Sequence, residues 1–344
     1  MRDVGLSRLA ITGFPGWLTQ ALVDDLVNSP LDNLRQVSVL VHPALLHAAS
    51  DLIKHNPLIS SVRAFDLVRP ESDLNSLHDT LNDVDVLLHS AAVIHPQRTA
   101  DWYRVNTKGT LQLARLARLA GVRRFVFISS NAAAGRCETS THVLTESDPA
   151  QPLSHYGRSK LLAEQGLMQL HRPGVFEVVI LRPSMFYGPP VPDRHVNLYR
   201  RILSGRMPMI GCGKYRRSIT YIDNMVQATR LALRCPAAAG ETFFVVDGPV
   251  YTTRSITEAM SSALGVRLKT LPLPAITGAA AYWTDRLLAS AGYYWQSLHL
   301  VGESHWHVAI SCAKSKAVLG YSPSIEVEEG MRRAVEWCRS RGKL

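Results

Sequence analysis

The chain has 344 residues, of which 46% are hydrophobic and 19% charged, values close to those of soluble globular proteins. This composition excludes a disordered, collagen-like or coiled-coil protein, and the length allows one large α/β unit with an elaborated end. The formal net charge of +10 at pH 7 would attract phosphates, acidic lipid surfaces or nucleic acid, and does not by itself select one of them.

Hydropathy and cysteine usage favour a cytoplasmic protein. The apolar stretch Leu9–Val23 contains Gly, Pro and Thr and has no small-residue cleavage site, so we interpret it as part of the folded protein. No uncharged run reaches the length of about 18 residues that a spanning membrane helix needs. The five cysteines lie far apart and show no metal-ligand spacing, which favours a reducing compartment and no bound metal.

In chain order, short β-rich runs alternate with helical patterns, which is typical of a Rossmann-type, doubly wound parallel sheet. The predicted strands are Arg8–Thr12, Val37–Val41, Val62–Asp66, Val84–His89, Arg124–Ser129 and Glu177–Arg182. The predicted helices among them are Gly16–Leu26, Tyr103–Ala120 and His155–Leu170.

The pattern becomes irregular after residue 189, which predicts two parts. We place a dinucleotide-binding domain at residues 1–189 and a smaller substrate-binding lobe at residues 190–344. Within the second part, about 215–250 is expected to return to the core, with a strand at Thr242–Val246, and the chain should finish in a helix over Ser324–Arg341.

A glycine turn follows the first predicted strand. Gly13 and Gly16 would let backbone N–H groups at the start of a helix approach a pyrophosphate, whose charge the helix dipole favours. Thr19 stands where the usual pattern has a third glycine. Two glycines in a turn can equally be a plain turn, so this loop needs its structural context to indicate a dinucleotide site.

A Tyr-x-x-x-Lys pair, Tyr156 and Lys160, lies in the predicted helix after the strand that ends in Ser129 and Ser130. Residues four apart share a helix face, so we expect the Lys160 ammonium to lie near the phenol and favour its ionised form. A phenol with an ordinary pKa of about 10 would then serve as an acid or base near neutral pH. The alternative is a solvated helix pair.

Together these motifs resemble the extended short-chain dehydrogenase/reductase family, the NAD(P)-dependent epimerase/dehydratase group. The resemblance covers nearly the whole chain. It includes, in order, Asp66-Leu67, His89-Ser90-Ala91-Ala92, Val105-Asn106-Thr107-Lys108-Gly109-Thr110, Phe127-Ile128-Ser129-Ser130, Leu181-Arg182-Pro183-Ser184 with Tyr187-Gly188-Pro189, and Tyr221-Ile222-Asp223-Asn224.

The resemblance implies catalytic roles for Ser130, Tyr156 and Lys160. Ser130 would hydrogen-bond the reacting oxygen, Tyr156 would transfer its proton, and Lys160 would hold the ribose and tune the phenol, while a nicotinamide carries the hydride. Counting back from Gly135 selects Ser130, and strand alternation should turn Ser129 to the opposite face.

The resemblance also implies the cofactor contacts. Gly13 and Gly16 would line the pyrophosphate, Asp66 and Leu67 the adenine, and Pro183 and Ser184 the nicotinamide end. The remaining expected contacts are Thr12, Phe14, Trp17, Leu18, Ser90, Ala91, Ala92 and Asn106.

The end of the second predicted strand bears on the choice of cofactor. Val41 and His42 stand there, and no acidic residue is present to bind the adenine ribose hydroxyls. We therefore predict NADP as the preferred cofactor, with NAD as the alternative. Arg35 or His42 would contact the 2′-phosphate, and a plain surface histidine is the other interpretation of His42.

Several residues bear on the substrate. Asn131 and Ala132 stand where the family's 4,6-dehydratases carry an Asp-Glu pair, which disfavours dehydration. Arg217 fits the place of an arginine that binds the diphosphate of a nucleotide sugar, or else belongs to a solvated basic loop. We expect Asn131, Met185 and Arg217 to contact the substrate.

The C-terminal third looks like the branch that contains 3β-hydroxysteroid dehydrogenases and dihydroflavonol-type reductases. It is rich in apolar and aromatic residues, namely Tyr282, Trp283, Leu287, Leu288, Tyr293, Tyr294, Trp295 and Leu298. Such residues can line a pocket, the core, an interface or a membrane surface.

These patterns predict an NAD(P)-dependent enzyme that interconverts a secondary alcohol and a ketone on a largely apolar or aromatic small molecule. A nucleotide-sugar 4-epimerase is the first alternative, and a non-catalytic dinucleotide-binding regulator is the second. Because the basic residues are dispersed, no nucleic-acid partner is expected. We expect a homodimer, and a peripheral membrane contact stays open.

Overall fold

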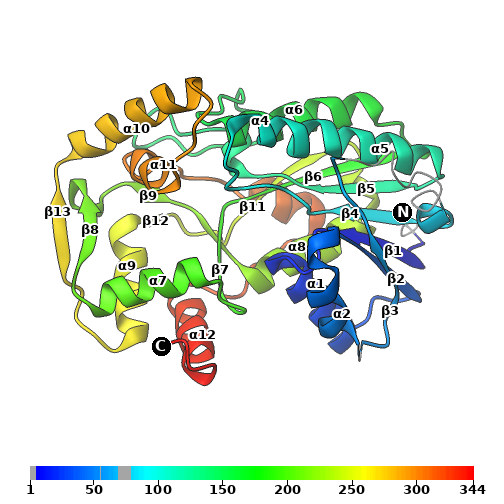
Figure 1. Ribbon diagram of the computed structural model, residues 1–344, viewed down its shortest axis with the longest axis horizontal. Helices are drawn as coiled ribbons and strands as arrows, with labels where there is room; N and C mark the ends of the chain where they lie inside the picture. Colours follow the sequence, from blue (N-terminus) through cyan, green and yellow to red (C-terminus); the bar gives the residue numbers. More distant parts are fainter. Residues whose placement is uncertain (1–4, 55, 69–78) are drawn as a thin grey trace.

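A parallel sheet of seven strands forms the centre of the computed structural model, which describes residues 5–54, 56–68 and 79–344 (Figure 1). Its strand order is β11-β6-β5-β4-β1-β2-β3. The strands are β1 (Arg8–Thr12), β2 (Gln36–Val41), β3 (Ile59–Ala64), β4 (Val86–His89), β5 (Arg124–Ile128), β6 (Glu177–Pro183) and β11 (Thr242–Val245). The order reverses between β1 and β4, the switch point at which such sheets bind ligands. The predicted Rossmann-type fold is confirmed.

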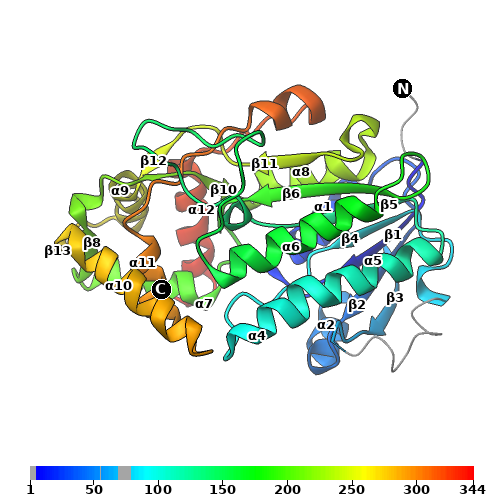
Figure 2. The same ribbon diagram turned by 90° about the horizontal axis from the view of Figure 1, so that it is seen from above.

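Side chains that alternate along the strands divide the core into two apolar layers. In β5, Val126 and Ile128 face one layer, and Phe125 and Phe127 face the other. Helices α1 (Trp17–Asn28) and α8 (Ile222–Arg234) pack on the first face, and α5 (Thr110–Leu119) and α6 (His155–Leu170) pack on the second (Figure 2). Because both faces are covered, the strands are almost continuously apolar.

Most predicted boundaries differ from the observed ones by one to three residues, and two of the differences have a visible structural cause. The third strand begins and ends earlier than Val62–Asp66, because Asp66 belongs to a turn in which its Oδ1 accepts a hydrogen bond from the Val68 nitrogen (2.9 Å). The predicted helix Tyr103–Ala120 consists of a π-helical part and an α-helical part. After the short α4 (Thr99–Asp101), residues Trp102–Gly109 form a π-helix that continues into α5.

A lobe built from the later part of the chain covers the carboxyl ends of the central strands. Two parallel strand pairs, β10 with β7 and β13 with β8, and one antiparallel pair, β12 with β9, belong to it. Its strands are β7 (Met185–Tyr187), β8 (Met207–Ile210), β9 (Arg216–Arg217), β10 (Ile219–Tyr221), β12 (Tyr251–Thr252) and β13 (Thr270–Leu273). Its helices are α7 (Asp193–Leu203), α9 (Thr253–Leu264), α10 (Ala275–Ser290), α11 (Gln296–Glu303) and α12 (Val327–Ser340). The remaining helix α2 (Leu46–Ile53) follows β2 in the central unit.

Strand β11 pairs with β6 at the edge of the central sheet, so the chain re-enters that sheet after leaving it for the lobe. Asp247, just beyond β11, accepts hydrogen bonds from the Tyr221 nitrogen (2.8 Å) and from Asn224 (2.8 Å). These bonds fasten the end of β11 to the start of α8. Among the described residues, no helix is long and apolar enough to cross a bilayer.

Candidate active site

The loop after β1 lies directly against the loop after β4. Gly13 has a φ of +88°, and a Cβ atom at this position would lie 2.6 Å from the Ala91 nitrogen. A Cβ atom on Gly16 would lie 2.5 Å from the Gly13 carbonyl oxygen. Only glycine fits such a cradle. Because no side chain caps the start of α1, its first N–H groups are left for an anion. The cradle fits the pyrophosphate of a dinucleotide.

Other predicted residues of this loop lie partly in the core. Phe14 and Leu18 are buried in the layer that α1 covers. The Trp17 ring makes edge contacts with Phe186 and His195, at centroid distances of 6.0 and 5.2 Å. Its indole Nε1 is buried and has no hydrogen-bond partner in the part of the chain that the structure describes. A donor of this kind is suited to a bound ligand.

Buried His89 ties the ends of β1 and β4 to α5. Its Nδ1 lies 2.7 Å from the Thr12 Oγ1, and its Nε2 lies 2.9 Å from the Thr110 Oγ1. Thr12 Oγ1 also accepts a hydrogen bond from the Ala91 nitrogen (3.3 Å). Burial, together with the charge of Lys160, lowers the pKa of His89 to about 3, so this imidazole is neutral.

The loop that carries Ser90, Ala91 and Ala92 is braced by Asn106. The Asn106 Oδ1 accepts from the Val93 nitrogen (2.9 Å), and its Nδ2 donates to the Val93 carbonyl (3.0 Å). A further bond of 3.2 Å reaches Ser159 Oγ on α6. The structure therefore places the Asn106 amide where it positions the loop.

The residues expected at the adenine end lie in and around the loops after β2 and β3. His42 is exposed directly after β2, and its Nδ1 accepts a hydrogen bond from the Ala44 nitrogen (3.3 Å). Leu67 is buried beside Gly109, where a Cβ atom would approach the Leu67 carbonyl to 2.9 Å. Arg35 precedes β2 and lies at the opposite, amino end of that strand. The structure does not bring Arg35 together with His42.

Ser130 and Tyr156 meet through close packing of α6 on the turn after β5. A Cβ atom on Gly157 would lie 2.1 Å from the Ala132 carbonyl, so the glycine after the tyrosine allows this approach. Ser130 Oγ accepts a hydrogen bond from the Ala132 nitrogen (3.2 Å) and bonds to the Tyr156 phenol. The helix itself is capped by Ser154, whose Oγ accepts from the Gly157 nitrogen.

The ionisation of the pair differs from the sequence-based expectation. Burial raises the pKa of Tyr156 to about 12, which the bond to Ser130 opposes and the charge of Glu303 supports. Lys160 is buried, its Nζ donates to the Ile128 carbonyl (2.8 Å), and burial lowers its pKa to about 7. The expected lowering of the phenol pKa by Lys160 is therefore wrong for the chain's own residues. At neutral pH the phenol holds its proton.

A buried ionic network that sequence reasoning missed lies one turn beyond Lys160. Glu164 accepts a hydrogen bond from Ser129 Oγ (2.5 Å) and pairs with the Arg182 guanidinium (Nη2 to Oε2, 2.5 Å). Ser129 is thus bound to α6 through Glu164, whereas Ser130 bonds to the Tyr156 phenol. The network joins β5, α6 and β6. Two features of the sequence could have indicated this network. They are an acidic residue four positions after Lys160 and an arginine inside an apolar strand.

Ser184, expected at the nicotinamide end, lies close to the residues expected to contact the substrate, Asn131, Met185 and Arg217. Ser184 follows β6, and its Oγ donates to the Ser218 carbonyl (2.6 Å). Met185 is exposed, whereas Asn131 opens the short 3₁₀ turn after Ser130. Arg217, on β9, is partly buried, and its Nη2 donates to the Glu303 carbonyl (2.9 Å). Burial lowers the pKa of Arg217, and Glu303 opposes this change.

The end of α11 supplies charges that sequence reasoning did not find. His299 pairs with Asp285 (2.7 Å) and with Glu303 (3.3 Å). Burial alone would lower the pKa of His299, but these two carboxylates outweigh it and raise the pKa to about 10. Glu303 acts on both Tyr156 and Arg217. The pair His299 and Glu303 stands four residues apart on α11, which local spacing could have indicated, whereas the effects of Glu303 on Tyr156 and Arg217 join segments far apart in the chain.

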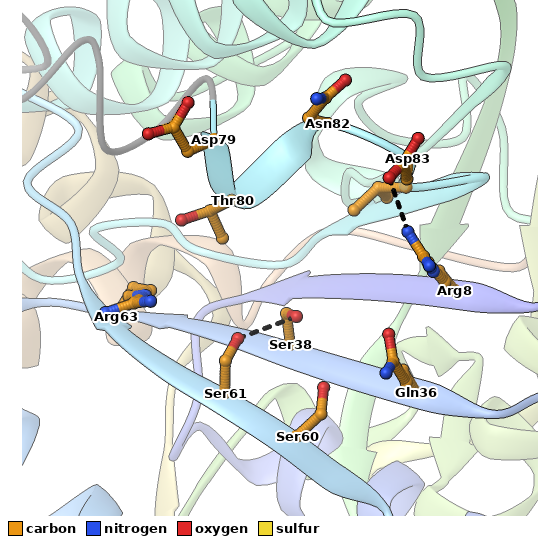
Figure 3. A pocket seen from close by; sticks show the side chains of 11 residues that line it. Arg8, Gln36, Ser38, Ser60, Ser61, Arg63, Asp79, Thr80, Asn82 and Asp83 are labelled. Atoms are coloured by element: carbon orange, nitrogen blue, oxygen red, sulfur yellow. Dashed lines mark hydrogen bonds and ion pairs between the residues drawn. The ribbon is translucent and has the colours of Figure 1, made fainter.

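A polar hollow on the central sheet is a separate feature. Figure 3 shows Ser61 donating to Ser38 (2.9 Å) and Arg8 paired with Asp83 (2.8 Å) along its wall. Because Arg8 is the first residue of β1, the hollow reaches the end of the sheet opposite to the glycine loop. It contains none of the predicted catalytic residues. Within the described ranges, no group of three or more His, Cys, Asp or Glu side chains is placed to hold a metal ion.

The ion pairs of His299 predict a pH-dependent stability. The pKa of this group rises from 6.5 to about 10 on folding, so its contribution is complete below pH 6.5 and is lost as the pH rises through about 10. The difference in Tm between the wild type and His299→Gln should therefore shrink across this range in thermal unfolding. Exposed His47, paired with Asp51 on α2, provides the control variant His47→Gln. An equal difference at all pH values would contradict the assignment.

Comparison with known proteins agrees with the geometry. The model of the NAD dependent epimerase/dehydratase family matches residues 9–246. The uncharacterized protein y4nL of Sinorhizobium fredii is 40% identical over 265 residues, which are 75% of this chain and 74% of that protein. UDP-glucose 4-epimerase of Vibrio cholerae is 28% identical over 77% of this chain and 80% of its own length.

Among solved structures, UDP-glucuronic acid 4-epimerase from Bacillus cereus in complex with NAD shares the fold. Its TM-score is 0.74 at 20% identity, with 97% of this chain and 99% of that chain covered. Because the family model spans well over half of the sequence and the y4nL protein is 40% identical over three quarters of it, this chain belongs to the NAD dependent epimerase/dehydratase family and is an NAD(P)-dependent enzyme.

Proposed function

We propose that the protein is a 4-epimerase of a sugar that is held through a diphosphate. The observation that carries this proposal is Arg217, a partly buried guanidinium fixed to the Glu303 carbonyl beside the Tyr156 site. A guanidinium is suited to binding phosphate oxygens through two parallel hydrogen bonds. The similarity to the Vibrio cholerae UDP-glucose 4-epimerase supports the same class of substrate.

The exposure of the C-terminal aromatic stretch weighs against the apolar substrate that we first expected. Trp283, Leu287 and Trp295 are 67%, 71% and 62% exposed, so they do not line an apolar pocket. Dehydration gains no support either, because the turn Asn131–Ala133 after Ser130 carries no carboxylate.

The chain's residues would handle one proton in each half of the reaction. In the oxidation half, the Tyr156 oxygen would take the proton of the substrate C4 hydroxyl, with Ser130 holding the same substrate oxygen. In the reduction half, the phenol would return that proton after the ketone has turned its other face. When bound, the oxidised nicotinamide supplies the hydride acceptor and a positive charge beside the phenol. Because burial disfavours the phenolate, this charge and protonated Lys160 would be needed to stabilise it.

A second candidate is reversible oxidation of an alcohol on an aromatic molecule. Trp102 makes an edge contact with Tyr294 (4.7 Å between centroids) and stacks with His155, the neighbour of Tyr156 (6.3 Å). Trp102 is buried, whereas the rings of Tyr294 and of His155, the first residue of α6, are half-buried and would be the ones to pack against an aromatic substrate. The expected homodimer stays a prediction.

Tyr156→Phe removes the transferable proton. Turnover should fall by a factor on the order of 10² or more, while cofactor binding stays nearly intact. Tyr103 offers the matched control, because its phenol lies nearby and bonds to His155 (2.7 Å), so Tyr103→Phe should retain most of the turnover. Wild-type turnover by Tyr156→Phe would refute the catalytic assignment.

Arg217→Ala tests the substrate class. Loss of the bonds to a diphosphate should raise the KM for a UDP- or GDP-sugar by roughly tenfold or more. Arg216→Ala is the control, since Arg216 bonds instead to the Ser140 and His142 carbonyls. The assay follows the stereochemistry of the product and the absorbance of NAD(P)H, because an epimerase regenerates its cofactor in each turnover. If hydrophobic ketones instead cause net oxidation of the cofactor, and Arg217→Ala does not affect this rate, the second candidate function, reversible oxidation of an alcohol, would be favoured.

We also propose a modest preference for NADP(H) over NAD(H), which fluorescence titration can measure as a ratio of Kd values. The support is the carboxyl end of β2, where exposed His42 follows Val41 and no acid is present. His42→Asp should shift the ratio toward NAD(H) by repelling a 2′-phosphate. Arg35→Ala should leave it unchanged, because Arg35 lies at the other end of the strand. Tighter binding of NAD(H) by the wild type would overturn the preference.

A further inference from the structure

One face of α10 exposes large apolar side chains to solvent. Ile276, Trp283 and Leu287 are 74%, 67% and 71% exposed, and their spacing places them on the same side of the helix. Tyr293 and Trp295, in the turn that leads to α11, continue the surface. We call these five residues the α10 surface. In both views α10 lies at the outer edge of the molecule, outside α11 (Figures 1 and 2).

The helix cannot turn this face inward without losing its other contacts. A Cβ atom on Gly278 would lie 2.6 Å from the His305 Cβ, and one on Gly302 would lie 2.9 Å from the Tyr282 Cα, so α10 packs tightly on the segment that follows it. Asp285, on this inner side, is buried and paired with His299 (2.7 Å). The apolar face is therefore fixed outward, and contiguous exposed apolar side chains of this kind mark a binding surface.

The charges around the α10 surface are positive. From Arg267 to Leu300 the one acidic residue is Asp285, which is buried. Arg286 is exposed on the helix, and exposed Arg98 lies beside Tyr293 through a backbone bridge. A surface with Trp and Tyr rings, aliphatic side chains and arginines, and with no exposed carboxylate between Arg267 and Leu300, matches a bilayer with anionic headgroups.

A second copy of the chain matches this surface less well. In a two-fold symmetric contact the same patch meets itself, so the arginines of both copies would share one interface, and residues 267–300 would provide no exposed carboxylate to pair with them. We propose that the α10 surface docks the enzyme on an anionic phospholipid bilayer. Tyr294, between Tyr293 and Trp295 of this surface, contacts Trp102, which stacks with His155 beside Tyr156, so docking would place the substrate side of the site close to the headgroups.

Sedimentation with vesicles tests this proposal on the full-length protein. Vesicles of phosphatidylcholine that contain phosphatidylglycerol should bind the wild type more tightly than vesicles of phosphatidylcholine alone, and salt should weaken the difference. The double variant Trp283→Gln/Leu287→Gln should lose roughly tenfold or more in partitioning, because two apolar side chains no longer leave water. Arg286→Glu should lower the preference for the anionic lipid.

The matched control is Leu119→Gln/Val175→Gln, two exposed apolar residues on α5 and before β6, which should leave binding unchanged. An equal loss in both double variants, or no sedimentation of the wild type with either vesicle, would overturn the proposal. Light scattering that shows a dimer dissolved by Trp283→Gln/Leu287→Gln would assign the surface to a second copy instead. An unchanged Tm shows that the variants fold. The result does not depend on epimerase activity.

Discussion

The geometry of the catalytic helix depends on one buried carboxylate. Glu164 holds β5 through Ser129 and β6 through Arg182, so α6 is fixed to two neighbouring strands at the depth where Lys160 lies. Breaking a buried ion pair on one side leaves the other charge without compensation, at a cost of about 3–5 kcal/mol. The spacing between Ser130 and the Tyr156 phenol follows from this attachment together with the contact between Gly157 and the turn after β5.

Burial has opposite effects on the two ionisable groups of the catalytic helix. It disfavours the anion at Tyr156 and the cation at Lys160, so each group is driven toward its neutral form. The charge that makes the phenol a base must therefore arrive with the ligand, and the protein contributes position, exclusion of water and a proton. The ionisation of Tyr156 therefore depends more on the charge of the bound ligand than on the interaction between Tyr156 and Lys160.

The parts of the fold that the sequence predicted correctly are those in which a hydrophobic period and a motif lie in one short segment. The strand before Gly13, the apolar run before Ser130 and the helix with Tyr156 each carry their own period and motif. The effect of the Glu303 charge on Tyr156 could not be foreseen, since it arises only when the end of α11 comes near α6, more than a hundred residues earlier in the chain. The direction of the Tyr156 pKa depends on burial, which no spacing reveals. Arg35, however, could have been excluded from chain direction alone, because a residue ahead of a strand lies at its amino end.

Because His89 is neutral, its contacts do not depend on pH in the physiological range. This imidazole stacks on the Phe127 ring and joins the glycine loop to α5 through two threonines, and with a pKa near 3 it keeps one protonation state throughout the physiological range. The link that His89 forms between the glycine loop and α5 therefore does not change with pH in this range. If Tyr156 and Lys160 act as proposed, a bell-shaped dependence of the rate on pH would report the ionisation of the phenol and the ammonium rather than a change in the contacts of His89.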